Sequence, residues 1–259
     1  MSEREQLEGR NVVIEALRRK RRKVREIMMD ERARPGSKVD ELVELAAQQG
    51  VPVKKVPREM LDRRSETGVH NGVLAWADAL EAHTTHSLLD TLAREGVDPF
   101  LVLVDEVQYE HNLGAILRSA MGAGVNGVIV PVRRGKGMSP VVSRVAMGGA
   151  EVVPLVREGL SSSLATLRRA GVRVVGCDMD GDPLWSVPLT GPIALVLGGE
   201  DKGLSSTLRD RCDQVASVPL EWGLDSLNVS VTAALFMFER QRQVLQGAPP
   251  WTRQQAGRG

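Results

Sequence analysis

The 259 residues suffice for one large domain or two ordinary ones, and a hydrophobic content of 42% with 26 glycines excludes a wholly disordered chain. The net charge is only +1, but 17 of the 34 basic residues and 12 of the 33 acidic ones lie within residues 1–64. This basic amino-terminal part is typical of proteins that touch nucleic acid. The eight aromatic residues are too few to favour RNA-binding folds that stack bases on an aromatic platform.

Membrane and metal signals are missing from the sequence. No run of 18 apolar residues occurs, and the first ten residues are charged and lack an apolar stretch. We therefore expect a cytoplasmic protein with no membrane partner. Cys177, Cys212, His83 and His86 form no metal-ligand spacing, so we expect buried free thiols and no metal.

The first 78 residues are predicted to form a small α/β domain. The spacing of apolar residues predicts helices over 9–22 and 37–49, and short apolar runs predict strands over 24–29, 51–56 and 71–77. Between the first helix and the first of these strands lies a basic run, residues 18–25, in which seven of the eight side chains are positive. Residues 79–98, with a short helix ending near residue 94, are predicted to be a linker.

Residues 99–245 alternate between strand and helix patterns. Short apolar runs without polar alternation predict strands over 101–104, 128–132, 172–176, 193–197 and 215–218. Such strands are buried on both faces, and the helices between them predict a parallel sheet covered on two sides. The last helix, 226 to about 244, is apolar nearly all round, which favours a subunit interface and a homodimer. Residues 246–259 are predicted to be a loose tail.

One glycine motif points away from nucleotide binding. Gly122, Gly124 and Gly127 fit the pattern G-x-G-x-x-G, but they follow a predicted helix and precede a predicted strand. A phosphate-binding loop needs the opposite order. We interpret these glycines as a helix end and a tight turn.

Polar residues follow the C-terminal ends of three of the predicted strands. Open parallel sheets bind ligands at these ends. Asn112 and Arg118 open a helix after the strand 101–104, a glycine-rich segment 198–205 follows the strand 193–197, and Ser226 and Asn228 follow the last strand. Helix capping and surface ion pairs can explain each position singly. They do not explain the ordered combination.

These segments resemble a known family. DEVQYEHNLGAILRSAMGAGV, LVLGGEDKGLS and VPLEWGLDSLNVSVTAALFMFE are similar to the three ordered motifs of the SpoU-type (TrmH-like) RNA ribose 2′-O-methyltransferases, a SPOUT group, over residues 99–245. LEGRNVVIEALRR and VHNGVLAW resemble the small RNA-binding domain, with a ribosomal-protein-like α/β fold, of the branch that modifies guanosine in 23S rRNA. That branch usually carries Gln at the position of Asn71.

The resemblance implies a fold and a site. The fold is an α/β domain whose parallel sheet contains a C-terminal trefoil knot, preceded by the small RNA-binding domain, and it works as a homodimer. The cofactor is S-adenosylmethionine, and the residues implied to hold it are Leu197, Gly198, Gly199, Val218, Leu220, Leu227 and Asn228. The residues implied to be catalytic are Asn112, Arg118, Glu200, Ser226 and Asn228.

Arg118 has two alternative roles, as a base or as an electrostatic stabiliser. The family's proposed role is removal of the hydroxyl proton, but a guanidinium hardly loses its own proton. A charged Arg118 can instead hold a phosphate and stabilise developing negative charge on oxygen.

The resemblance also gives the basic run a candidate function. Arg18, Arg19, Arg21 and Arg22 are predicted to contact RNA phosphates, with a solvated charged face as the alternative. The expected substrate is 23S rRNA, because members acting on transfer RNA tend to lack the extra domain. A transfer RNA, or a ribosomal site whose methylation gives antibiotic resistance, is the alternative substrate. A non-catalytic RNA-binding protein on the same scaffold is the alternative of a different class.

Overall fold

The computed structural model describes residues 4–133, 135–199 and 203–247, and its contacts divide the chain into two compact units. The first unit holds the residues up to His83 together with Tyr109–Arg118 and Lys136–Leu155. The second holds Thr84–Gln108, Ser119–Gly135 and the chain from Val156 onward. None of the described helices is long and apolar enough to cross a membrane.

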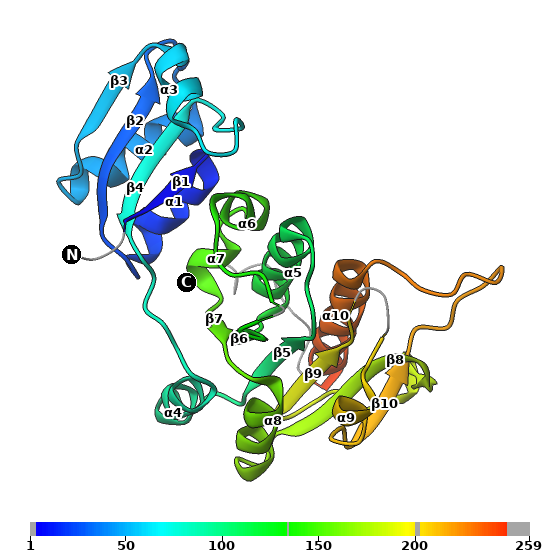
Figure 1. Cartoon of the computed structure of the whole chain (residues 1–259). Coiled ribbons are helices and arrows are strands. Elements are labelled where there is room, and N and C mark those ends of the chain that lie inside the picture. The colour runs from blue at the N-terminus through cyan, green and yellow to red at the C-terminus, as the bar shows by residue number, and fades with distance from the viewer. Residues whose placement is uncertain (1–3, 134, 200–202, 248–259) are drawn as a thin grey trace. The chain divides into compact units, whose positions relative to one another are not determined.

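The amino-terminal part of the first unit is built on a four-stranded mixed sheet (Figure 1). Its strand order is β1-β4-β2-β3; β4 is antiparallel to both β1 and β2, whereas β3 is parallel to β2. The strands are β1 (Arg4–Glu8), β2 (Val24–Asp30), β3 (Val53–Val56) and β4 (Val73–Asp78). The parallel pair β2–β3 is joined through a helix, as parallel neighbours require.

Helices cover both faces of this sheet. α1 (Arg10–Arg19) and α2 (Ser37–Gln48) pack on one face through a core that includes Leu17, Ile27 and Leu42. α3 (Arg58–Arg64) covers the other face through a smaller core around Leu61. The predicted helix 9–22 ends at Arg19, because Lys20 adopts a left-handed conformation with φ 55°.

The sequence analysis missed β1 and α3. β1 lacks an apolar alternation because two of its inward positions are polar, Gln6 and Glu8. Their side chains are satisfied by the segment that follows α3: Gln6 Nε2 donates to the carbonyl of Arg64 at 2.9 Å, and Glu8 accepts from the backbone N–H of Glu66 at 2.7 Å. A buried polar strand of this kind is stable because its hydrogen bonds are made.

The first unit also contains α6 (Pro140–Ala146), α7 (Gly149–Val152) and the opening turns of α5 (Glu110–Ala123). α6 contacts β1, and α7 contacts α1. α5 approaches α6 closely at Gly114, where an added Cβ would lie 2.6 Å from Cβ of Val145. It approaches α7 closely at Gly149, where an added Cβ would lie 2.6 Å from the carbonyl oxygen of Leu117.

The second unit is built on a six-stranded sheet of order β10-β8-β9-β5-β6-β7. The described pairings of β5 with β6 and β9, and of β8 with β9 and β10, are all parallel, which confirms the predicted parallel α/β sheet. The strands are β5 (Phe100–Val104), β6 (Gly127–Val130), β7 (Leu155–Arg157), β8 (Arg173–Pro183), β9 (Ile193–Leu197) and β10 (Gln214–Ser217). All residues of β5, β6 and β9 are buried.

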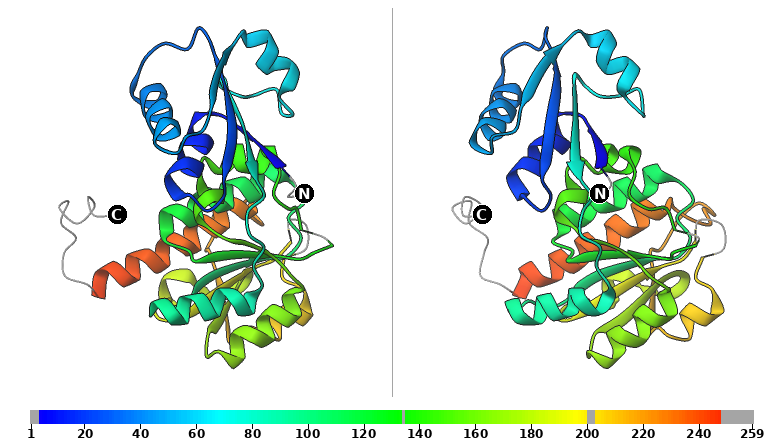
Figure 2. Two further views of the ribbon diagram at one scale, coloured as in Figure 1. Left: turned by 90° about the vertical axis from the view of Figure 1, so that its left-hand side faces the viewer. Right: turned by 60° about the vertical axis from the view of Figure 1, so that its left-hand side comes forward.

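Helices lie on both faces of this sheet (Figure 2). α4 (Thr85–Glu95), α8 (Leu160–Arg169) and α9 (Ser206–Arg209) share one apolar core against the first face. α10 (Val229–Gly247) lies on the other face with the last turn of α5, where the ring of Phe238 lies 3.4 Å from the Cβ position of Gly122. Residues 79–98 therefore contain more than a connection, because α4 buries Leu88, Leu89 and Leu92 in this core.

Three features of the second unit differ from the sequence-based expectations. β7 was not predicted, β8 runs on to Pro183, and α10 begins at Val229 rather than at residue 226. The added part of β8 is polar and gives no strand signal; it pairs with β10 where Gly181 comes so close that a Cβ would lie 2.6 Å from the backbone nitrogen of Ala216. The interpretation of the glycine motif is confirmed, since α5 ends at Ala123 and Gly124 has φ 74°.

Candidate functional site

The loop after β9 closes on itself through its glycines. The N–H of Gly199 donates to the carbonyl of Gly203 at 3.1 Å, and the N–H of Gly203 donates back to Gly199 at 3.2 Å. A Cβ on Gly198 would collide with the backbone of Gly203 and with the nitrogen of Leu204. Only glycine fits at residue 198, and the buried Leu197 fixes the start of the loop. Glu200 lies outside the described residues.

The loop after β5 lies against the loop after β9. The N–H of Asp105 donates to the carbonyl of Leu197 at 3.0 Å, and the carboxylate of Glu106 lies 3.4 Å from the Cβ position of Gly199. Glu106 has φ 56°, a left-handed conformation that costs energy in a non-glycine residue. Glu106 follows the predicted strand 101–104 but was given no role in the predicted site, because its approach to Gly199 depends on the pairing of β5 with β9.

The segment after β10 leads into α10. Val218, Leu220 and Leu227 are half-buried, whereas Ser226 and Asn228 are exposed. Asn228 Oδ1 accepts from the N–H of Ser230 at 2.8 Å and from its hydroxyl at 2.6 Å, so Asn228 caps α10. These residues and the glycine loop all follow the C-terminal ends of parallel strands in the second unit.

Asn112 and Arg118 belong to the first unit and are described with it. Asn112 is half-buried on the first turn of α5, and Arg118 follows two turns later with an exposed side chain. The position of Arg118 is fixed by close helix packing, since the Cβ position of Gly149 lies 3.0 Å from its backbone nitrogen. Among the described residues, no carboxylate pairs with Arg118.

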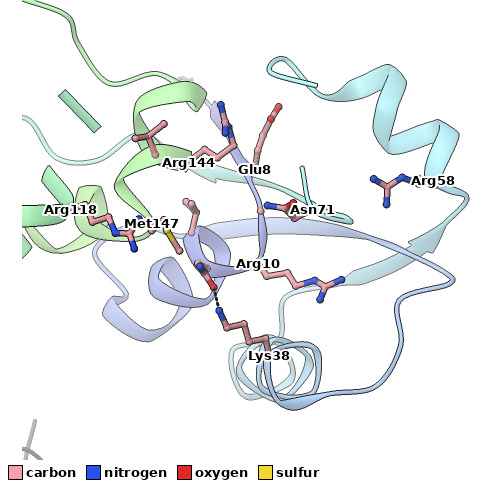
Figure 3. Close-up of a pocket in the computed structure, with 12 residues that line it drawn as sticks. Glu8, Arg10, Lys38, Arg58, Asn71, Arg118, Arg144 and Met147 are labelled. Carbon is pink, nitrogen blue, oxygen red and sulfur yellow. Dashed lines mark hydrogen bonds between the residues drawn. The ribbon is translucent and has the colours of Figure 1, made fainter. Parts of the chain in front are cut away.

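Arg118 lines a cavity of about 700 Å³ within the first unit (Figure 3), hereafter the Arg118 cavity. Arg144 and Val145 of α6 and Met147 at the end of that helix also line the cavity, and the other lining residues belong to the amino-terminal domain. The lining residues are Glu8, Gly9, Arg10, Asn11, Val12, Lys38, Arg58, Asn71, Arg118, Arg144, Val145 and Met147. Arg10, Lys38, Arg58 and Arg144 were not predicted as site residues, because they are far apart along the chain and only their packing brings them together.

The structure places the arginines of the basic run in two different environments. Arg18 and Arg19 are exposed, and both pair with Glu15. Arg21 is half-buried and donates to the carbonyl of Val152 at 3.1 Å; burial lowers the pKa of Arg21. Its donors are thus engaged by the protein backbone.

The prediction that Arg22 contacts RNA is wrong. Its side chain is fully buried and pairs with the equally buried Glu151, with Nε donating to Oε2 at 2.9 Å, and with Glu5 at 2.5 Å. Burial alone would lower the pKa of Arg22, but the hydrogen bond and charge of Glu151 raise it above its usual value. A guanidinium so enclosed is unavailable to a phosphate.

The two cysteines are a buried and a half-buried side chain. Cys177 and Cys212 are free thiols; burial raises the pKa of Cys177 well above its usual value and that of Cys212 to about 11. Both thiols therefore stay protonated near neutral pH. Within the described ranges, no group of three His, Cys, Asp or Glu residues could hold a metal ion.

Comparisons with known proteins find matches for both the amino-terminal and the C-terminal part of the chain. Residues 99–238 match the SpoU rRNA Methylase family, and residues 6–83 match the domain described as RNA 2′-O ribose methyltransferase substrate binding. The 23S rRNA (guanosine-2′-O-)-methyltransferase RlmB of Pseudomonas aeruginosa is 38% identical over 94% of this chain and 98% of its own length. The putative TrmH family tRNA/rRNA methyltransferase YacO of Bacillus subtilis is 34% identical over 91% of this chain and 94% of its own.

A solved structure extends the similarity to the fold. The SpoU methyltransferase AviRb from Streptomyces viridochromogenes, in complex with the cofactor AdoMet, superposes with a TM-score of 0.74 at 25% identity. The superposition covers 94% of this chain and 91% of AviRb. On the family match and on the identity over nearly the whole length, this chain belongs to the SpoU rRNA methylase family.

Proposed function

We propose that this chain, an S-adenosylmethionine-dependent RNA 2′-O-ribose methyltransferase of the SpoU family, methylates a guanosine of 23S rRNA. The substrate is inferred from how much of the chain resembles a relative with a named substrate. The relative named as a 23S rRNA guanosine methyltransferase matches the chain through both the substrate-binding domain and the methylase domain.

The substrate is tested by mapping 2′-O-methyl groups. We expect purified enzyme and S-adenosylmethionine carrying a labelled methyl group to label one guanosine ribose of unmodified 23S rRNA, and deletion in the source cell to remove that methyl group. Label found only in transfer RNA would contradict the proposal. So would label on a 23S rRNA nucleotide other than guanosine.

The residues that follow β9 and β10 along the chain have the properties needed to bind the cofactor. When bound, S-adenosylmethionine supplies an activated methyl group on a sulfonium. Gly198 and Gly199 leave their backbone open to close approach, and Leu197, Val218, Leu220 and Leu227 offer apolar surface. Ser226 and Asn228, both exposed after β10, are the polar groups that we propose to orient the ribose together with Asn112 and Glu200.

Methyl transfer to a hydroxyl oxygen requires alignment of the reacting atoms and loss of the hydroxyl proton. We propose that Arg118 acts electrostatically. Its guanidinium stays charged at neutral pH, and the described residues provide no carboxylate to neutralise it. Arg118 can therefore hold a phosphate of the target nucleotide and stabilise negative charge on the attacking oxygen, leaving the proton to water or to another acceptor.

Gly198 gives a direct test of the cofactor site. Because a Cβ there would strike the backbone of Gly203 and Leu204, Gly198→Ala must open the loop. We expect the affinity for S-adenosylmethionine, measured by calorimetry, to fall about tenfold, equivalent to roughly 1.4 kcal/mol of loop strain. Gly36→Ala is the control, because an added Cβ at Gly36 meets nothing within 4 Å and its backbone is extended, with φ 169°. Equal affinities in the two variants would contradict this placement of the cofactor.

A trefoil knot is proposed for the C-terminal part of the sheet. After β9 the chain passes β8 to form β10 on its far side, and α10 then returns to contact β9. Gln243 near the end of α10 is held by the connection between β8 and β9: it donates to the carbonyl of Val187 at 3.0 Å and accepts from the N–H of Leu189 at 2.7 Å. This contact between the end of α10 and the connection between β8 and β9 supports a knotted path.

We propose a homodimer that buries the outer face of α10. Val231, Leu235 and Phe238 lie along one side of the helix and are 47%, 37% and 45% exposed, whereas Phe236 and Met237 are buried. An apolar stripe of this kind favours a protein partner, and the same helix in a second copy supplies one.

The dimer is tested by sedimentation. The wild-type protein should sediment as a dimer at micromolar concentration, and Val231→Lys/Leu235→Lys should sediment as a monomer, because two charges cannot be buried in an apolar interface without partners. Val43→Lys, at an exposed valine of α2, serves as the control and should remain dimeric. A wild-type protein that is monomeric and active would refute the dimer.

The proposed domain organisation follows from these assignments. Residues 1–78 form the RNA-binding domain, and 79–98 connect it to the methyltransferase domain predicted over 99–245. The tail predicted from residue 246 begins no earlier than residue 248, because α10 runs to Gly247. Within the connection, α4 packs with the methyltransferase core. Residues 248–259 of the tail lie outside the described residues.

A further inference from the structure

We propose that the Arg118 cavity is a phosphate-binding site that holds the RNA backbone beside Arg118, with Arg10, Lys38, Arg58 and Arg144 as its ligands. This inference rests on the proposed function in that the ligand is RNA. It goes further in assigning the binding residues, which lie outside the basic run and outside the three methyltransferase motifs.

The charge of the cavity wall is strongly unbalanced. Among the described residues, five cations line it and Glu8 is the one lining carboxylate. That carboxylate is buried and engaged by the side chains of Ser65 and Thr67 and by two backbone N–H groups. Arg58 approaches Asp30 at 3.7 Å, and Lys38 donates to Asn11 at 2.7 Å. Concave surfaces lined by one sign of charge concentrate counter-ions of the other sign, so the cavity is suited to an anion.

Two of the arginines carry buried donors that the described part of the chain leaves unsatisfied. Nε of Arg10 and Nε of Arg144 are inaccessible to solvent and have no acceptor there. A buried N–H without an acceptor is costly, and the cost is larger for a charged group. Both arginines line the Arg118 cavity, so oxygen atoms of a ligand that reorients these side chains could supply the acceptors.

The cavity is also the right size for more than a single ion. Its volume of about 700 Å³ lies within the roughly 300–1,000 Å³ typical of organic ligand sites. The lining cations come from α1, α2, α3, α5 and α6. Figure 3 shows Arg10, Lys38 and Arg58 on the side of the amino-terminal domain, and Arg118 and Arg144 on the side of α5 and α6. Cations spread in this way match successive phosphates of a strand.

The backbone that borders the cavity has positive φ values at several positions, including Met147 with φ 50°. Gly9, Asn71 and Gly72 have φ values of 99°, 49° and 81°, and they bring Asn71 and Arg10 to the wall: Asn71 Nδ2 lies 3.7 Å from the Cβ position of Gly9, and Arg10 Nη2 lies 3.6 Å from that of Gly72. Left-handed backbone at a non-glycine residue persists where its surroundings impose it and is concentrated at ligand sites. Asn71 adds an amide donor to the cations.

The experiment compares the salt dependence of RNA binding in three full-length proteins. Arg10→Gln/Arg144→Gln removes the two cations with unsatisfied donors. Lys38→Gln/Arg58→Gln removes two cations with exposed side chains, and Arg169→Gln removes an exposed cation on α8. The probes are 23S rRNA and poly(U). We expect each cavity variant to lower the log–log salt slope by about 0.7–0.9 per cation and to weaken binding of both RNAs at least tenfold at low salt.

Two controls keep the result specific. Calorimetric affinity for S-adenosylmethionine should be unchanged in every variant, which shows that the methyltransferase domain is intact, and Arg169→Gln should bind RNA with the wild-type slope. Unchanged slopes in both cavity variants would overturn the proposal. So would binding of inorganic phosphate or pyrophosphate that the cavity variants lose while their RNA slopes stay at the wild-type value, since the site would then serve a small anion.

The outcome separates this inference from the proposed function. If the wild-type enzyme fails to methylate 23S rRNA but the cavity variants still flatten the slope for poly(U), the substrate assignment fails and the phosphate site stands. If methylation occurs and the slopes do not change, the phosphate site fails and the substrate assignment stands.

Discussion

Replacement of Arg118 by alanine should lower kcat for methyl transfer by about 10²–10³-fold, the loss typical of removing one preorganised group that stabilises developing charge on oxygen. The side chain is exposed and, among the described residues, without an ion-pair partner. Its removal therefore leaves no buried charge behind, and we expect the fold and the affinity for S-adenosylmethionine to be unchanged. Single-turnover assays with saturating RNA measure the chemical step apart from binding.

Arg118→Lys distinguishes point charge from geometry. Lysine keeps the charge but loses the planar fork that binds two oxygens of one phosphate, so we expect it to recover only a small part of the lost rate. Full activity in Arg118→Lys would show that charge alone suffices. Near-normal turnover in Arg118→Ala would remove Arg118 from the catalytic residues, and Arg169→Ala provides the baseline for loss of a surface arginine.

The second large effect is expected at Glu151. Within the described part of the chain, Glu151→Ala leaves the buried Arg22 with Glu5 as its one charged partner. Breaking a buried pair by removing one member costs about 3–5 kcal/mol, because the remaining charge is left without compensation. We expect a loss of this size in the free energy of unfolding measured by urea denaturation, with little change in the RNA salt slope.

Two further variants test whether burial of the Arg22–Glu151 pair is the cause of the large loss of stability expected in Glu151→Ala. Arg25→Met breaks the Arg25–Asp78 pair, which is 39% and 23% exposed, and it should destabilise the protein far less than Glu151→Ala because exposed pairs contribute little. Arg22→Met/Glu151→Leu removes both buried charges and should recover most of the stability lost in Glu151→Ala. A cost below 1 kcal/mol for Glu151→Ala would contradict the buried pair.

Much of the secondary structure of the second unit can be predicted from the local sequence. β5, β6 and β9 are predicted within two residues at each end, because a strand buried on both faces leaves an uninterrupted apolar run. The order of helix, glycines and strand at residues 122–127 also excludes a phosphate loop, and the structure has the left-handed Gly124 as a helix end. The polar half of β8 and the strand β1 could not be found this way, since their partners, rather than their own side chains, make them strands.

The surroundings of the charged residues could not be predicted from the local sequence. Residues 18–25 form the densest basic run in the chain, yet Arg22 is buried against Glu151, which lies 129 positions away. Arg10 and Arg144 occur singly in the sequence, yet both line the cavity around Arg118. The sequence by itself determined the family motifs, the parallel sheet and the candidate catalytic arginine. Tertiary structure decided which arginines are neutralised and which face a cavity, because the state of a charge depends on the groups within about 4–6 Å of it, and long-range packing brings those groups together.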